Sequence, residues 1–161
     1  MRINDDLKVY TGNSGFKKKI ATIIFNPCFH SVFLYRLSNL FYRLHLNIIA
    51  KIIWYFNRVV FNVDIDYRAD LAGGFALIHG MGTVIGMNVK SLGKLIVYQG
   101  VTIGGTNNKV RKINGDNLLD QPIIGNNVII YTDAKIFGPV IIGDNNIIKA
   151  SSIVTKDMEK K

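Results

Sequence analysis

Aliphatic residues recur every six positions through the second half of this chain, and this spacing constrains the fold more than any other feature. The series is Ile124, Ile130, Ile136, Ile142, Ile148 and Val154. Four residues after its first five members stand mostly small side chains: Val128, Ala134, Val140, Asn146 and Ser152. A six-residue period fits neither an α-helix, which repeats about every 3.6 residues, nor a strand with alternating faces. It is typical of a parallel β-helix, in which three repeats form one coil and aliphatic side chains stack along the axis.

A second series with the same spacing precedes the first: Ile65, Leu71, Leu77, Thr83, Val89, Leu95 and Val101. Val101 and Ile124 are 23 residues apart, which is not a multiple of six, so the segment between them breaks the period. Because residues 105–122 are polar and basic, we expect them to form an excursion loop. Long loops on a rigid scaffold are often functional. The sequence therefore predicts a β-helix domain over residues 63–161, with the excursion at about 105–122.

The first 62 residues follow a helical pattern instead. Apolar residues recur at three- and four-residue steps between Pro27 and Leu46, and Asn26-Pro27 favours a helix start. A second helix is expected from about Ile48 to about Phe61. We predict a small α-helical segment over residues 1–62 that caps one end of the β-helix, since an open sheet edge needs a cover.

The positive charge of the chain lies mainly in this helical part. The net charge is +9, and residues 1–62 hold nine Lys and Arg against two acidic residues. A basic and apolar front half favours contact with an anionic partner: phospholipid head groups, nucleic acid or a phosphorylated ligand. The alternative is a solvated basic surface. No nucleic-acid recognition element is recognisable, so we do not expect a nucleic-acid partner.

The most apolar stretch, residues 46–63, is about long enough to cross a bilayer, but Lys51 and Arg58 interrupt it. We therefore expect a buried or interfacial helix, with peripheral membrane contact through residues 17–61. No secretory signal is visible, and the single cysteine, Cys28, excludes a disulfide framework. These features favour a cytoplasmic protein, in contact with the inner membrane face.

His79 is the candidate catalytic residue, because it lies among glycines in the repeat region, 15 residues after Asp64. That separation is close to one coil, so the two side chains are expected near each other on adjacent turns. A carboxylate that holds one ring nitrogen of a histidine leaves the other nitrogen as a base. The alternative is a histidine that only satisfies a turn. His30 and His45 lie in the helical part and are expected to be structural, and no metal is expected.

Several short motifs, in order, resemble the hexapeptide-repeat acyltransferases, and among them the serine O-acetyltransferase branch. They are Tyr35-Arg36, Val63-Asp64-Ile65, Leu77-Ile78-His79-Gly80, Val101 to Thr106, Ala134-Lys135-Ile136 with Gly138, and Ala150 to Val154. The resemblance covers roughly residues 25–158. It implies a mainly β fold: a left-handed parallel β-helix of hexapeptide repeats preceded by the small α-helical segment.

The resemblance also implies the site and its ligands. His79 would be the general base and Asp64 its orienting partner, with acetyl-CoA as the co-substrate. The cofactor-binding positions would be Gly105, Thr106, Thr132 and Ala150. Members of the family form homotrimers with sites between subunits, so a homotrimer is expected.

The chain departs from the serine enzymes where these hold the amino acid. Ile78 replaces an Asp before the catalytic His, and Asp120-Gln121-Pro122 stands at an Arg-His-Pro triplet. A site that grips charged groups should keep its charged partners. We therefore expect an O-acetyltransferase that acts on a hydroxyl of a sugar or polysaccharide precursor. The alternatives are a serine O-acetyltransferase of cysteine biosynthesis and, in another class, a non-catalytic β-helix scaffold.

Overall fold

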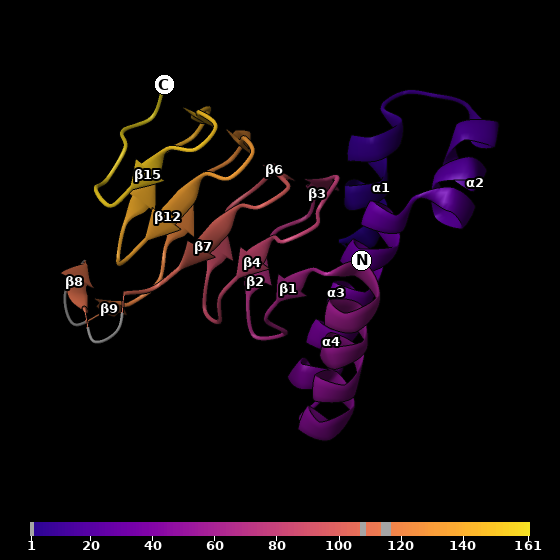
Figure 1. Cartoon of the computed structure of the whole chain (residues 1–161), viewed down its shortest axis with the longest axis horizontal. Coiled ribbons are helices and arrows are strands. Elements are labelled where there is room, and N and C mark those ends of the chain that lie inside the picture. Colours follow the sequence, from indigo (N-terminus) through magenta and orange to yellow (C-terminus); the bar gives the residue numbers. More distant parts are fainter. Residues whose placement is uncertain (1, 107–108, 114–116) are drawn as a thin grey trace.

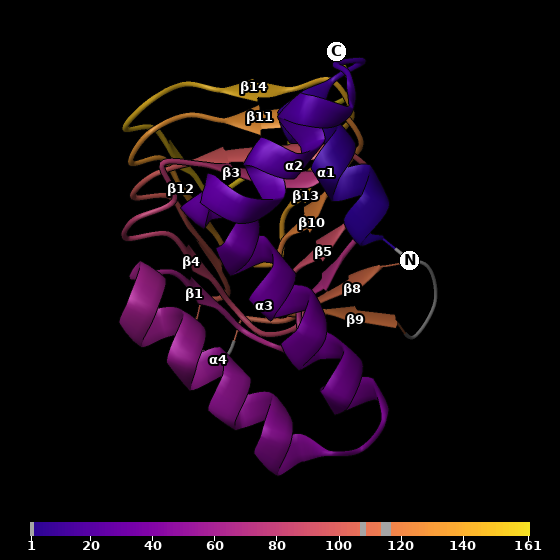
Figure 2. The ribbon, with the colours of Figure 1, turned by 90° about the vertical axis from the view of Figure 1, so that its right-hand side faces the viewer.

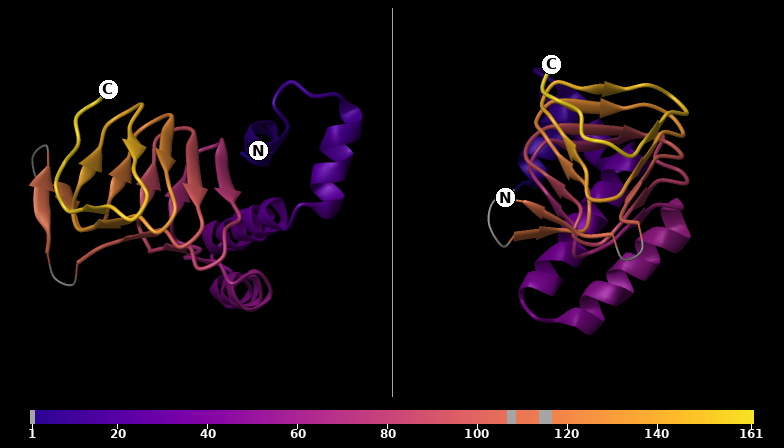
Figure 3. Two further views of the ribbon diagram at one scale, coloured as in Figure 1. Left: turned by 45° about the horizontal axis from the view of Figure 1, so that its top comes forward. Right: turned by 90° about the vertical axis from the view of Figure 1, so that its left-hand side faces the viewer.

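The computed structural model describes residues 2–106, 109–113 and 117–161, and in it the repeats form the predicted left-handed parallel β-helix (Figure 1; Figure 3). Its short strands build three faces. Face 1 contains β1 (Asp64–Ile65), β4 (Val84–Ile85), β7 (Thr102–Gly104), β12 (Lys135–Phe137) and β15 (Ile153–Val154). Face 2 contains β2 (Asp70–Leu71), β5 (Lys90–Ser91), β10 (Ile123–Ile124) and β13 (Ile141–Ile142). Face 3 contains β3 (Phe75–Ile78), β6 (Leu95–Tyr98), β11 (Val128–Ile130) and β14 (Ile147–Ile148).

The aliphatic side chains of the first series stack in the core. Ile124, Ile130, Ile136 and Ile142 are fully buried. The parallel register pairs residues one coil apart, such as Ile136 with Val154 on face 1. Burial of such a column supplies most of the driving force for the fold, since each fully buried aliphatic side chain contributes about 1.5–3 kcal/mol.

The phase predicted for the upstream series is wrong after Leu77. The stacked inward residues there are Leu77 and Ile85, which are eight residues apart instead of six. From Thr83 onward the predicted series follows a second buried position of each repeat. The two additional residues lie in the turn between β3 and β4, which contains His79.

Among the described residues, the helices that precede β1 are α1 (Ile3–Thr11), α2 (Phe16–Phe25), α3 (Pro27–Arg43) and α4 (Asn47–Phe61). The start of α3 is as predicted: the side chain of Asn26 accepts a hydrogen bond of 3.1 Å from the backbone nitrogen of Phe29, and Pro27 needs no donor at this position. The helix ends before the predicted Leu46, and His45, with a φ of 61°, lies in the connection to α4.

The helices cap the end of the β-helix that begins with β1 (Figure 1). The ion pair between Arg36 on α3 and the fully buried Asp6 on α1, with N–O distances of 2.8 and 3.0 Å, anchors this cap. The same Asp6 carboxylate accepts hydrogen bonds of 2.9 Å from the backbone nitrogens of Gly74 and Phe75. Helical side chains thus satisfy backbone groups of the first coil that no preceding coil is there to pair.

The chain leaves the coil after β7 and rejoins it at β10. Between these two strands, β8 (Arg111–Ile113) and β9 (Asn117–Leu119) pair in antiparallel fashion. The coil register resumes directly afterwards, because Ser91 on face 2 pairs with Ile124. The excursion therefore adds a loop at one edge without disturbing the stacking of the coils.

Candidate active site

The turn that carries His79 is two residues longer than the corresponding turns of the later coils, as the register of faces 1 and 3 shows. His79, Gly80 and Gly82 have φ values of 62°, 66° and 71°, in the left-handed region that side chains rarely adopt. The turn is fixed by hydrogen bonds from the Gly82 nitrogen to the Asn62 carbonyl (2.8 Å) and from the Gly100 nitrogen to the Met81 carbonyl (2.9 Å). His79 is exposed on this turn, at the edge between face 3 and face 1.

Asp64 lies beside the same turn, since its backbone nitrogen donates to the Thr83 carbonyl (2.9 Å). Its carboxylate accepts a hydrogen bond of 2.9 Å from the indole nitrogen of Trp54 and lies 3.3 Å from the Arg58 guanidinium. Among the hydrogen bonds of the described residues, none joins Asp64 to His79. The structure brings both residues to one edge, but two α4 side chains, Trp54 and Arg58, hold the carboxylate.

A cavity of about 810 Å³ lies between His79 and the helices. Its wall includes Phe25 of α2 and Phe61 of α4, together with the polar side chains Tyr10 and Cys28. Burial raises the pKa of both the Tyr10 hydroxyl and the Cys28 thiol, so both groups stay neutral at pH 7. A largely apolar concave space with a few polar groups is the usual setting of a small-molecule site.

Thr132 and Ala150 lie on the same edge as His79, two and three coils further along. Their turns stack directly, since the Ser151 nitrogen donates to the Thr132 carbonyl (2.8 Å). Neighbouring strands are about 4.8 Å apart, so these turns lie roughly 10 and 14 Å from the His79 turn along the axis. We call this column of turns (79–83, 99–101, 131–134 and 149–152) the histidine edge.

Gly105 and Thr106 lie on another edge, where face 1 meets face 2 and the excursion begins. We call this the glycine edge (residues 86, 104–106, 121 and 138–140). Among the described residues, the buried oxygens Thr106 Oγ1 and Gln121 Oε1 have no hydrogen-bond partner there. Buried polar atoms of this kind need an explanation, and a ligand is one. A single chain therefore does not bring Gly105 and Thr106 together with Thr132 and Ala150.

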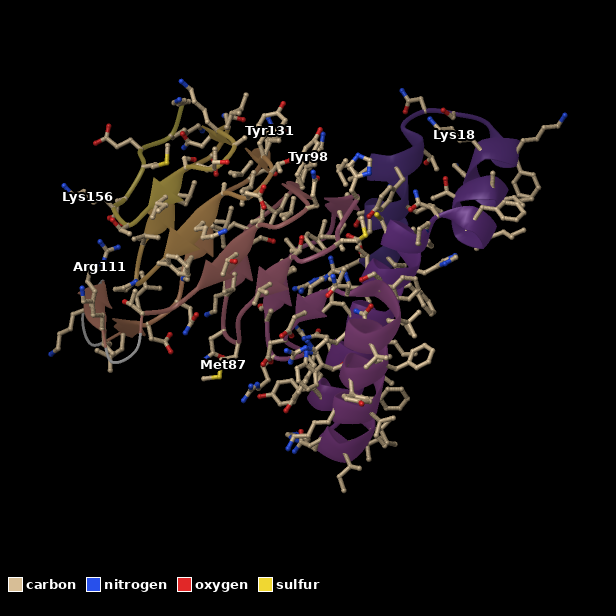
Figure 4. All side chains as sticks on the ribbon, in the orientation of Figure 1. Lys18, Met87, Tyr98, Arg111, Tyr131 and Lys156 are labelled. Atoms are coloured by element: carbon tan, nitrogen blue, oxygen red, sulfur yellow. The ribbon has the colours of Figure 1, made fainter. Side chains whose placement is uncertain are left out.

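Two tyrosines next to the histidine edge have no signal in the sequence. Tyr98 and Tyr131 are neighbours on the outer surface of face 3, with ring centroids 4.9 Å apart (Figure 4). They continue the row that begins at Ile78, because Ile78 pairs with Tyr98. The excursion separates the two tyrosines by 33 residues, so no simple period relates them. Within the described residues, no group of three or more His, Cys, Asp or Glu side chains is arranged to hold a metal ion.

The proteins most similar to this chain in sequence share one name. No family model matches the chain. A serine acetyltransferase of Synechococcus elongatus is 29% identical over 150 residues, which cover 93% of this chain and 59% of that protein. A serine acetyltransferase of Bacillus pumilus is 30% identical over 150 residues, which cover 93% of this chain and 66% of that protein.

Solved structures agree with the sequence comparison. The serine acetyltransferase of Neisseria gonorrhoeae in complex with serine has a TM-score of 0.83 and 28% identity, covering 99% of this chain and 63% of that chain. The serine acetyltransferase of Brucella abortus in complex with coenzyme A has a TM-score of 0.83 and 26% identity, covering 98% and 61%. This chain spans less than two thirds of the length of these relatives.

These comparisons contradict the expected sugar or polysaccharide acceptor and a role in polysaccharide biosynthesis. Similarity to serine acetyltransferases extends over 93% of the chain in sequence and 99% in structure. The expectation rested on a few exchanged residues, chiefly Ile78 and Gln121. Such local exchanges carry less weight than similarity across the whole fold, because a site can hold one ligand with different side chains.

Proposed function

Because this chain belongs to the hexapeptide-repeat acyltransferase superfamily, on its serine O-acetyltransferase branch, we propose that it transfers the acetyl group of acetyl-CoA to the side-chain hydroxyl of L-serine. The observation that carries the proposal is the lengthened turn of His79. It holds an exposed imidazole in a left-handed backbone, on the histidine edge and in the wall of the cavity.

In this reaction His79 is the general base. It takes the proton from the serine hydroxyl while that oxygen attacks the carbonyl carbon of the thioester. The carbon–sulfur bond then breaks, and the thiolate takes the proton from the His79 imidazolium, so that coenzyme A leaves as the thiol and the base is regenerated. Asp64 has a positioning role: with Trp54 and Arg58 it fixes the start of β1, next to the His79 turn. General-base catalysis by a positioned side chain contributes typically about 10²–10⁴-fold to the rate.

Two features support an anionic, extended donor such as acetyl-CoA. The turns of the histidine edge form a straight column, with small or exposed residues at Thr132 and Ala150. A cleft of about 400 Å³ next to the glycine edge is lined by Lys109 and Lys156, and also by Arg111, which pairs with Asp157 at 2.7 Å. Lysine side chains of this kind bind phosphates.

We propose further that the working form is a homotrimer. The two halves of the donor site lie on different edges of one chain, and a neighbouring copy would supply the missing half.

The test is the release of free coenzyme A thiol from acetyl-CoA with L-serine as the acceptor. His79→Asn is the informative variant, because Asn tolerates a φ of 62° better than Ala does and cannot act as the base. We expect the rate to fall by about 10²–10⁴-fold. His45→Asn is the matched control, since His45 has a φ of 61° and lies in the connection between α3 and α4; it should keep full activity.

Turnover with L-serine that His79→Asn removes and His45→Asn keeps would support the proposal. Equal turnover by the His79→Asn variant would refute the role of His79. Binding of coenzyme A without turnover of serine would refute the acceptor. Absence of both would favour a non-catalytic scaffold.

A further inference from the structure

Helix α4 presents an apolar surface to solvent. Ile48, Ile52, Tyr55 and Val59 recur at three- and four-residue steps, so they lie on one side of the helix, and each is more than 60% exposed. The buried residues of α4 are Ala50 and Asn57, on the opposite side. An exposed apolar stripe of this length is unusual on a monomeric soluble surface and marks a contact site.

Helix α2 extends this surface. Among its ten residues only Thr22 is buried, while Phe16, Ile23 and Ile24 are about half exposed or more and do not line the cavity of His79. Figure 2, which looks on to the helical end of the molecule, shows α2 in front of the β-helix and α4 lower in the view, with α3 between them. Residues of both helices also line the cavity that contains His79. We call the outer surfaces of α2 and α4 the helical face.

The charge around the helical face has one sign. Residues 7–63 contain eight Lys and Arg and no Asp or Glu. Arg36, Arg43 and Arg58 form ion pairs with Asp side chains from other parts of the chain. The side chains of Lys17, Lys18, Lys19 and Lys51 are exposed and have no ion pair among the described residues. Lys18 lies on the side of α2 that faces the β-helix (Figure 4) and lines the cavity of His79, so Lys17, Lys19 and Lys51 are the lysines available to an outside partner.

We propose that the helical face docks on the surface of a lipid bilayer that contains anionic phospholipids. Apolar side chains with flanking lysines are the composition of helices that lie in the plane of a membrane interface. Anionic head groups attract each such lysine. A symmetric contact with a second copy would instead bring the same patch against itself, so that the lysines of the two copies would repel each other.

The helices are suited to lying on a bilayer. Within the described part of the chain, no single helix is long and apolar enough to cross a membrane. Helices α2 and α3 together are long and apolar enough to cross a membrane, but the two helices are bent by 75° where they meet. Val32 and Tyr35 of α3 belong to the core that α3 shares with the β-helix, so this helix is committed to the folded domain.

The test is co-sedimentation of the full chain with vesicles of phosphatidylcholine alone and of phosphatidylcholine with phosphatidylglycerol. We expect binding to the anionic vesicles only, and weaker binding at high salt. Replacing Lys17, Lys19 and Lys51 together by Ser should weaken binding by at least about tenfold. The matched control replaces Lys90, Lys94 and Lys149, three exposed lysines of the β-helix, by Ser and should bind as the unaltered chain does.

A second pair of variants tests the apolar contribution. Ile48→Ser with Ile52→Ser should reduce binding, whereas Leu92→Ser with Ile153→Ser, two equally exposed residues of the β-helix, should not. Circular dichroism checks that all variants stay folded. The proposal is overturned if the unaltered chain does not sediment with anionic vesicles, or if the two triple lysine variants lose binding equally. It is also overturned if the unaltered chain binds no lipid and the double variant of Ile48 and Ile52 changes its oligomeric state, since the helical face would then be a contact between copies. The readout is independent of the acetyltransferase proposal.

Discussion

A methyl group at position 105 would lie 2.4 Å from Gln121 Nε2 and 2.8 Å from the Asp120 carbonyl oxygen. At the neighbouring position 104 it would meet nothing within 4 Å. Glycine is therefore required at 105 and not at 104, although the two residues look alike in the sequence. The requirement arises because the excursion returns to the coil at Asp120 and Gln121 and packs directly on Gly105.

Gly105→Ala should consequently cost about 1–3 kcal/mol of stability, because the Asp120 backbone has to move. We also expect weaker binding of coenzyme A, since the glycine edge shifts with it. Gly104→Ala is the control and should change stability by no more than about 0.5 kcal/mol. Urea unfolding and calorimetric titration with coenzyme A measure the two effects. Equal effects of the two substitutions would show that packing at Gly105 is not the constraint.

Helices α1 and α3 meet the first coil through side chains that each serve several backbone groups. Asp6 binds Arg36 and two backbone nitrogens, and Arg36 also donates to the Leu71 and Ala72 carbonyls. The Tyr35 hydroxyl donates to the Ala69 carbonyl at 2.8 Å. These contacts replace the coil that would otherwise precede β1, so the helices and the β-helix should unfold as one unit.

Asp6→Ala should therefore destabilise the whole chain by about 3–5 kcal/mol, the usual cost of leaving one partner of a buried ion pair alone. Lys8→Ala is the matched control on α1, because Lys8 and Asp5 form an exposed pair at 3.3 Å, and it should cost no more than about 1 kcal/mol. Chemical unfolding followed by circular dichroism compares them. A single transition is expected in both; separate transitions for helix and sheet signals would contradict the shared cap.

At the scale of helices and strands, the sequence predicts most of the elements but little of the packing between them. The repeat predicts the coils, and Asn26-Pro27 predicts the start of α3, because both depend on residues close in the chain. The phase after Leu77 is lost because two extra residues interrupt the period at the turn of His79. The spacing of Asp64 and His79 indicates their shared edge. The contacts of Asp64 with Trp54 and Arg58, and the cavity behind His79, depend on the packing of α4, which no local pattern reports.

The whole molecule presents the two halves of its proposed donor site on two different edges, the histidine edge and the glycine edge. In a symmetric assembly each contact would join the histidine edge of one copy to the glycine edge of the next. Activity should then depend on assembly, and dilution below the association range should abolish turnover.

Mixed assemblies test this arrangement. The His79→Asn chain lacks the base, and the Gly105→Ala chain is impaired in donor binding. After the two are unfolded and refolded together, roughly a quarter of the contacts would join two unaltered edges, so activity should return to about that fraction. Each variant refolded alone is the control. If the site lies within one chain, the mixture will be no more active than the sum of its parts.

The stacked turns of the histidine edge also set fixed distances along the axis of the β-helix. Each coil adds one step of about 4.8 Å, and three steps separate His79 from Ala150. The chain leaves the coil after β7 and returns at β10 without altering this spacing, because the strands on either side keep their parallel pairing. The length of this loop can therefore differ between related chains while the distance between the turns of His79 and Ala150 stays the same. Only the gain or loss of a complete coil would change the length of a donor molecule that fits along this edge.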